Sequence, residues 1–98
     1  MNIEKIVGAD ETVLKIGGCL DTAAAAEFGA ALADAAKAKT LVVDFSDLEF
    51  IASSGIRLLV SENKKSVAAG RSIVLAGMNE VVADVFDVTG LNEIFPIR

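Results

Sequence analysis

The chain contains no His, Trp or Tyr and has a single cysteine, Cys19. Histidine is the commonest general base and metal ligand near neutral pH, so its absence disfavours most enzyme classes. A zinc site usually takes several Cys or His ligands, and one cysteine leaves it almost nothing to use. Because Cys19 cannot form an internal disulfide, we expect a reducing, cytoplasmic environment. No metal is expected.

Basic charge and long apolar runs are also scarce. Nine Lys and Arg stand against 14 Asp and Glu, which gives a formal net charge of −5. This charge argues against binding to nucleic acid or to an anionic membrane, since both need a basic face. No run approaches the ~20 apolar residues that cross a bilayer, and no leader pattern is present, so no membrane insertion is expected. The chain also has no Gly-rich phosphate loop followed by Lys-Ser/Thr, and we expect neither a cofactor nor catalysis.

Aliphatic residues are abundant instead. Of the 98 residues, 53% are hydrophobic, but only 5% are aromatic and all of these are Phe. A chain of this length is typical of one domain that buries roughly 60–70% of its unfolded surface. We therefore expect residues 1–98 to form a single domain around a compact aliphatic core.

The apolar pattern predicts strands that alternate with helices. Strands are expected at Met1–Val7, Thr12–Gly17, Thr40–Phe45 and Ser72–Ala76, with Gly17-Gly18 ending the second. Helices are expected from Asp21 or Thr22 to about Lys37, from about Ser54 to near Gly70, and over Glu80–Val88 with Asn79 as N-cap. The first two strands should form an antiparallel hairpin. The order β-β-α-β-α-β-α then implies parallel neighbours and a mixed sheet, which is an α/β fold.

The two longer helices each show an apolar face at helical spacing. The face of the first is expected to comprise Ala25, Phe28, Leu32 and Ala35. The face of the second is expected to comprise Ile56, Leu59, Val60 and Val67. Both faces should pack on the sheet.

A pair of serines, Ser53 and Ser54, stands where the third strand passes into the second long helix. The first N–H groups of a helix have no intrahelical partner, and serine is among the best residues to satisfy them. One serine can therefore be the N-cap while the other is solvated. The same place favours negative charge because the helix dipole is positive there, so a phosphate on either serine would also be stabilised. Local physics leaves both interpretations open.

Three segments around this junction resemble the STAS domain family, which is named for sulfate transporters and anti-sigma factor antagonists. The run Val-Asp-Phe-Ser-Asp-Leu-Glu-Phe-Ile-Ala-Ser-Ser-Gly-Ile-Arg (43–57) is similar to the family signature. Residues 18–22 are similar to its Gly-x-Leu-Asp turn and residues 89–97 to its closing segment. Ala52 departs from the pattern, because the family often has Asp before the first serine. The resemblance implies a single STAS-type domain, with a mixed β-sheet of four to five strands and helices packed mainly on one face.

The resemblance also implies a function, that of a bacterial anti-sigma factor antagonist. The unphosphorylated form would bind an anti-sigma factor that is also a serine kinase, and so free a sigma factor to regulate transcription. Phosphorylation would break this complex and a serine phosphatase would restore it, which is a partner-switching cycle. The family pattern places the phosphate acceptor at Ser53, with Ser54 in reserve. Such a protein is not an enzyme.

The expected partner-binding residues surround the serines: Asp21, Thr22, Asp44, Ser53, Ser54, Gly55 and Arg57. Asp21 and Asp44 end predicted strands, and if these strands are parallel neighbours the two carboxylates lie near the serines at one edge. Each residue also has a structural interpretation. Asp21 can cap a helix, Asp44 can be a polar strand end, and Arg57 can be a solvated helix residue. Gly55 can let a backbone or a partner approach the helix start.

Two other functions remain open. STAS domains also serve as accessory subunits that regulate membrane transporters or lipid-transport ATPases, and neighbouring genes would separate this function from the first. A small enzyme or nucleotide-binding protein would be stabilised by ATP or GTP in a thermal melt. The sequence does not reveal the anti-sigma factor, the signal or the oligomeric state.

Overall fold

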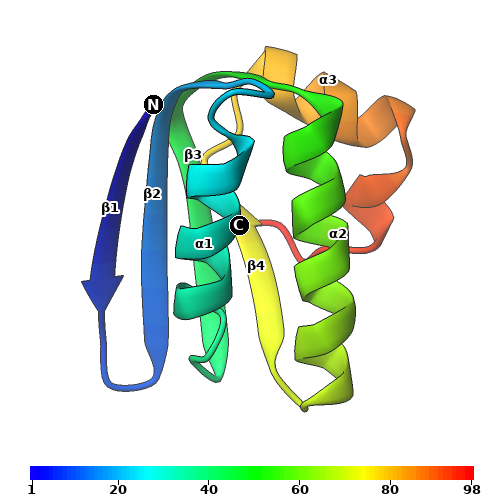
Figure 1. Cartoon of the computed structure of the whole chain (residues 1–98). Coiled ribbons are helices and arrows are strands. Elements are labelled where there is room, and N and C mark those ends of the chain that lie inside the picture. Colours follow the sequence, from blue (N-terminus) through cyan, green and yellow to red (C-terminus); the bar gives the residue numbers. More distant parts are fainter.

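Four strands, three helices and a short 3-10 turn make up the computed structural model, which describes all of residues 1–98 (Figure 1). The strands are β1 (Asn2–Val7), β2 (Glu11–Leu20), β3 (Thr40–Ile51) and β4 (Ser72–Ala76). The helices are α1 (Ala25–Ala35), α2 (Ser53–Ala68) and α3 (Glu80–Val88), followed by the turn η1 (Leu91–Glu93). The predicted order of strands and helices is confirmed.

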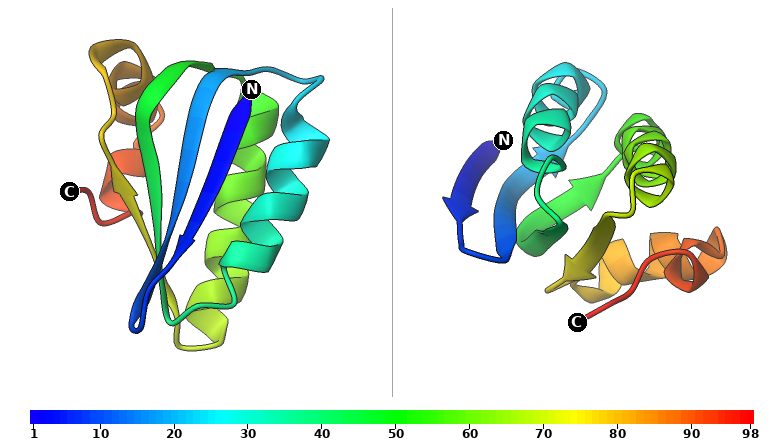
Figure 2. Two further views of the ribbon diagram at one scale, coloured as in Figure 1. Left: turned by 90° about the vertical axis from the view of Figure 1, so that its left-hand side faces the viewer. Right: turned by 90° about the horizontal axis from the view of Figure 1, so that it is seen from below.

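The strands form one mixed sheet in the order β1-β2-β3-β4. β1 and β2 form the expected antiparallel hairpin, whereas β2, β3 and β4 run parallel. The helices α1 and α2 connect these parallel strands and cover one face of the sheet, while α3 and the C-terminal segment lie on the other side, near β4 (Figure 2). The result is a single small α/β domain, as predicted.

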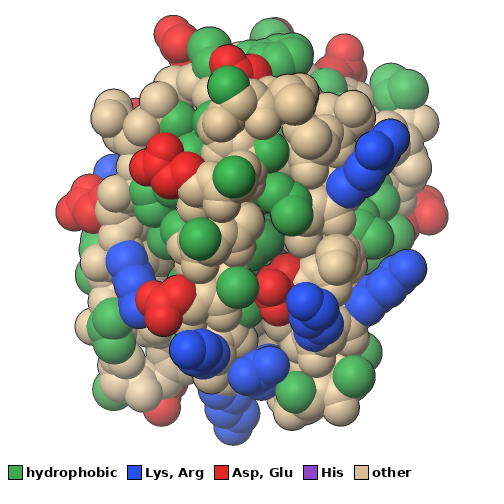
Figure 3. Space-filling view, in the orientation of Figure 1, with side chains coloured by type: hydrophobic (Ala, Val, Ile, Leu, Met, Phe, Trp, Pro, Cys, Tyr) green, Lys and Arg blue, Asp and Glu red, His purple; other side chains and the backbone are tan.

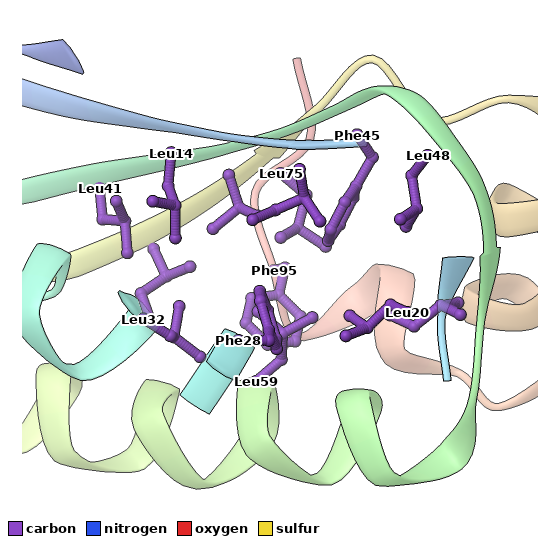
Figure 4. Close-up of a cluster of buried hydrophobic side chains, with 14 of the residues drawn as sticks. Leu14, Leu20, Phe28, Leu32, Leu41, Phe45, Leu48, Leu59, Leu75 and Phe95 are labelled. Atoms are coloured by element: carbon purple, nitrogen blue, oxygen red, sulfur yellow. The ribbon is translucent and has the colours of Figure 1, made fainter. Parts of the chain in front are cut away.

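The core lies between the sheet and the two connecting helices (Figure 4). Alternate residues of the strands point into it, among them Leu14, Leu41 and Leu75, because side chains alternate across a pleated strand. Phe28 and Leu32 of α1 meet them from the helix side, as the apolar face predicts. Phe45, Phe86 and Phe95 extend the core beside β4, with ring centroids 6.2 Å apart for Phe45 and Phe86 and 6.4 Å apart for Phe86 and Phe95.

The second strand does not end at Gly17-Gly18, and this prediction is wrong. β2 continues to Leu20, with irregularities in its register against β3 between Lys15 and Gly17 and between Gly18 and Cys19. Gly18 has a φ of +86°, which side-chain-bearing residues rarely adopt. The glycines therefore bend the strand and shift its register, and pairing resumes beyond them.

The first helix begins later and ends earlier than predicted. α1 starts at Ala25, after a turn over residues 22–24, and stops at Ala35, two residues short of Lys37. The Asp21 carboxylate accepts a hydrogen bond from the Ala24 backbone N–H at 2.9 Å. Asp21 thus caps the turn that precedes the helix, and no side chain caps the helix itself.

The predicted apolar face of α2 is right at its start and wrong at its end. Leu59 is fully buried, and Ile56 and Val60 are partly buried, but Val67 is 65% exposed. Seven residues make nearly two full turns, so Ser66 lies beneath Leu59 and is buried in place of Val67. None of the helices is both long and apolar enough to span a membrane.

Candidate functional site at the start of α2

The ends of β2 and β3 bring Asp21 and Ser53 to the same edge of the domain. Leu20 pairs with Ile51 in the last parallel rung of the sheet, and the Leu20 carbonyl accepts a hydrogen bond from the Ala52 N–H at 2.8 Å. Asp21 and Ser53 follow immediately, and both are exposed. Thr22, also exposed, completes this group. The expectation that the carboxyl ends of two parallel strands meet here is confirmed for Asp21.

Ala52, and neither serine, is the N-cap of α2. Ala52 has extended backbone angles, φ −85° and ψ 162°, and makes no side-chain capping bond. Its carbonyl accepts hydrogen bonds from the N–H groups of Gly55 at 3.0 Å and Ile56 at 3.2 Å. The N–H groups of Ser53 and Ser54 donate to no group of the protein. The helix therefore starts with free donors at its positive end, where an anion is stabilised.

The two serines differ in their access to solvent. Ser53 is exposed, and it is the first residue of the helix. The Ser54 side-chain oxygen is buried without a hydrogen-bond partner, beside the groove between α1 and α2. The Ser53 side chain is therefore accessible to a modifying enzyme, whereas the Ser54 hydroxyl oxygen is not.

Gly55 is buried, and Leu20 occupies the space that a side chain at this position would need. A Cβ built on Gly55 would lie 2.8 Å from Leu20 Cδ2 and 3.3 Å from Ile51 Cγ1. Leu20 is itself fully buried. The space at Gly55 is therefore filled by the side chain of Leu20, and not by a backbone or a partner as expected. Gly55 lets the end of β2 pack closely against the start of α2.

Asp44 does not join the group, which corrects the prediction that it ends its strand near the serines. β3 continues for seven residues beyond Asp44, which pairs with Lys15 and Ala76 within the sheet. The Asp44 carboxylate accepts hydrogen bonds from the Ser46 N–H at 2.9 Å and the Ser46 hydroxyl at 2.6 Å. Asp44 therefore stabilises the local conformation of β3. It lies within the strand, nine residues before the start of α2.

Arg57 lies one helical turn beyond Ser53 and is exposed. It lines the groove between α1 and α2, which measures about 510 Å³ and has mostly small residues of α1 on its opposite wall. Its positive charge is therefore on the same side of the domain as Ser53. None of the Asp, Glu and Cys side chains gather into a group of three or more that could hold a metal ion.

Sequence reasoning missed Phe50, which is 46% exposed and lies three residues before the candidate serine Ser53. It pairs in register with Cys19, which is also exposed. The other four phenylalanines are at most 2% exposed. Residue type predicts a core position for Phe50, and so does the alternation from the buried Leu48. The register irregularity between Gly18 and Cys19 interrupts this alternation, so Phe50 is exposed and Ile51 is buried. Exposed aromatic residues are favoured anchors at protein interfaces.

Comparison with known proteins identifies the family. Residues 1–98 match the family model of the STAS domain. An anti-sigma-B factor antagonist from Staphylococcus epidermidis is 26% identical over 100 residues, which cover 100% of this chain and 93% of that protein. The structure of the anti-sigma factor antagonist SpoIIAA in its unphosphorylated form has a TM-score of 0.84 at 23% identity, covering 99% of this chain and 88% of that one. The phosphorylated form of the Bacillus cell fate determinant SpoIIAA has a TM-score of 0.76 at 22% identity, covering 99% and 91%. The chain therefore belongs to the STAS domain family.

Proposed function

We propose that this protein is an anti-sigma factor antagonist that is switched by phosphorylation at Ser53. Its unphosphorylated form binds an anti-sigma factor that is also a serine kinase, and a sigma factor is released. The STAS family assignment and the antagonists among its relatives support this role. The observation that carries the proposal is Ser53 itself, an exposed hydroxyl at the first position of a helix whose first N–H groups are free.

A phosphate at Ser53 fits this helix start without refolding the domain. It adds about −1.5 to −2 charges and three acceptor oxygens. The free N–H groups of Ser53 and Ser54 point toward this end, and the helix dipole stabilises an anion there by about 0.3–1 kcal/mol at an exposed site. SpoIIAA has this fold in both its unphosphorylated and its phosphorylated forms, which is consistent with a switch that leaves the fold intact.

The consequence of phosphorylation falls on the binding surface. Asp21 already places one carboxylate at this edge, so the phosphate turns a mixed surface into a strongly anionic one. A partner surface matched to the neutral hydroxyl then faces an unpaired dianion, and juxtaposed like charges cost several kcal/mol. The kinase supplies ATP and catalysis, since this chain has no phosphate loop. A serine phosphatase returns the protein to its binding form.

The binding test compares two substitutions that add the same charge at opposite ends of the domain. Ser53→Asp places a carboxylate at the start of α2, whereas Ser72→Asp places one at the exposed start of β4. Calorimetric titration with the purified anti-sigma factor kinase of the same bacterium should give a Kd at least about tenfold higher for Ser53→Asp, because a tenfold change needs only about 1.4 kcal/mol. Ser72→Asp should bind like the wild type. Unchanged binding by Ser53→Asp would overturn the switch.

A further inference from the structure

Helix α3 presents an apolar stripe to solvent. Val81 is 59% exposed and Val88 is 83% exposed, while Val85 between them is half-buried. Their spacing of four and three residues aligns them along one side of the helix. They line a shallow depression of about 450 Å³ together with Asp84 and Thr89. The fully buried Val82 and Phe86 lie about 110° around the helix from this stripe. Val85 also packs against the core, so the side chains that the fold leaves largely to solvent are Val81 and Val88.

An acidic stripe runs beside the apolar one. Glu80, Asp84 and Asp87 repeat the same spacing, are all exposed, and take part in none of the four salt bridges of the structure. At 100° per residue, Asp84 lies 40° around the helix from Val88, so the two stripes are adjacent. Asp87 stands in the last turn, where the helix dipole favours cations, and that turn has no basic residue. Arg98 lines a hollow together with these three carboxylates, but its guanidinium pairs with Glu11, and Asn92 donates a hydrogen bond to Asp87. The acidic border of α3 therefore keeps an excess of negative charge.

This charge pattern argues against two occupants of the stripe. A second copy that packs α3 against α3 would bring acidic stripes together, and an anionic membrane would be repelled. The basic side chains of the chain itself gather at the C-terminal ends of α1 and α2, at the lower end of the face in Figure 3, as Lys37, Lys39, Lys64, Lys65 and Arg71. The start of α2, with Ser53, lies at the opposite end of these helices.

We infer that α3 docks an amphipathic helix of a partner protein whose apolar residues are bordered on one side by Lys or Arg. The nine residues of α3 span about 14 Å, which matches roughly two to three turns of such a helix. The partner's apolar side chains cover Val81, Val85 and Val88, and its cations balance Asp84 and Asp87. Because α3 lies across the sheet from α1 and α2, this surface is separate from the candidate site at Ser53 (Figure 2).

A designed peptide provides the probe. It is an amphipathic helix of about 15–18 residues, long enough to form a helix, with a Leu stripe bordered on one side by Lys. One control peptide carries Glu in place of Lys, and another carries Ser in place of Leu. In a titration of isotope-labelled protein followed by NMR, the Lys-bordered peptide should shift the amide signals of α3 and η1. It should bind at least about tenfold more tightly than either control.

Three double variants separate the stripe from general electrostatic attraction. Val81→Ser/Val88→Ser removes the apolar stripe, and Asp84→Lys/Asp87→Lys reverses its acidic border. Both variants should lower the affinity for the Lys-bordered peptide at least about tenfold, and the charge reversal should create a preference for the Glu-bordered peptide. Glu4→Lys/Asp10→Lys makes the same change in net charge at exposed positions of the β1 hairpin and should change the affinity by less than about twofold.

Several results would overturn the inference. Equal losses in the two Lys-substituted variants would show attraction to net charge alone, and signal shifts away from α3 would place the peptide elsewhere. Self-association of the free protein that disappears in Val81→Ser/Val88→Ser would make a second copy the occupant. Ser53→Asp should bind the peptide like the wild type. Loss of peptide binding in Ser53→Asp would contradict a surface separate from the candidate site. Loss of anti-sigma factor binding in that variant, with peptide binding unchanged, tests only the proposed function.

Discussion

Gly55→Ala should destabilise the domain, although alanine is normally the better helix residue. An Ala in place of Gly inside a helix usually stabilises it by about 1 kcal/mol. At Gly55, however, the new Cβ would lie 2.8 Å from Leu20 Cδ2 and 2.9 Å from Leu20 Cγ. Leu20 is fully buried and cannot move into solvent. Overpacking of this kind costs about 1–3 kcal/mol, so we expect a net loss of about 1 kcal/mol.

Gly29→Ala is the matched control, because Gly29 is inside α1 and its neighbours leave room. A Cβ there would meet Leu58 Cδ1 and Cδ2 at 3.4 Å, which is ordinary van der Waals contact. This variant should gain about 1 kcal/mol from helix propensity. Urea unfolding followed by circular dichroism gives both free energies of unfolding, and the two substitutions should change them in opposite directions.

The contact with Leu20 can be tested by a double-mutant cycle. Leu20→Ala removes the atoms that would clash and should itself cost about 2–5 kcal/mol as a large-to-small core change. In that background, Gly55→Ala should become neutral or stabilising, which is a coupling between residues in contact. A Gly55→Ala protein as stable as Gly29→Ala, or a cost that persists in the Leu20→Ala background, would refute the packing at the start of α2.

Three other substitutions test the fold. Asn79→Ala should cost about 1–2 kcal/mol in urea unfolding, because its side chain both caps α3 and donates to the Leu48 carbonyl at 2.8 Å; an unchanged midpoint would contradict this. Ser66→Ala should stabilise by about 1 kcal/mol, since its buried hydroxyl has no partner, and a loss would reveal an unseen bond. The hydrogen-bonded Arg98 guanidinium holds the pKa of Glu11 below its ordinary value of 4.5. The stabilisation by this pair is present above that value and is lost as the pH falls through the lowered pKa. The melting temperature of Glu11→Gln should therefore fall less at acid pH than that of the wild type. An equal fall in both proteins would contradict the ion pair.

The sequence correctly predicted features that depend on residues close together in the chain. Asn79 was predicted as an N-cap from residue type and position, and its side chain accepts from the Val82 N–H at 2.8 Å. The buried face of α1 was predicted from spacing, because Phe28 and Leu32 recur at the helical period. Both features depend on residues within about one turn of each other, which a sequence displays directly.

Tertiary contacts decided the features that the sequence did not reveal. The polar residues Ser46, Asp47 and Glu49 suggest that β3 ends at Phe45, yet pairing with β2 beyond the glycines extends it to Ile51. Because β3 extends to Ile51, Asp44 lies within the strand and not at the candidate site. The same pairing ends in the hydrogen bond between Ala52 and Leu20, which makes Ala52 the N-cap in preference to a serine. Register irregularities depend on both strands, so neither sequence segment predicts them alone.

The sequence predicted only part of the candidate site, because the rest depends on tertiary contacts. Asp21, Thr22 and Ser53 lie together as the resemblance to STAS domains implies, and Arg57 lies one turn further along α2. The difference in access between Ser53 and Ser54 could not be predicted, because it depends on how α1 packs beside α2. That difference is what favours Ser53 as the acceptor in the proposed switch.

The most direct test of the proposed switch is intact-mass spectrometry of the protein from its native cells, with peptide mapping of residues 40–64. A single phosphate on Ser53 in some growth conditions and its absence in others is the predicted result. A phosphate on Ser54 would contradict the burial of that hydroxyl. No phosphate under any condition would contradict the switch and point to a binding module that is always active, such as an accessory subunit of a transporter.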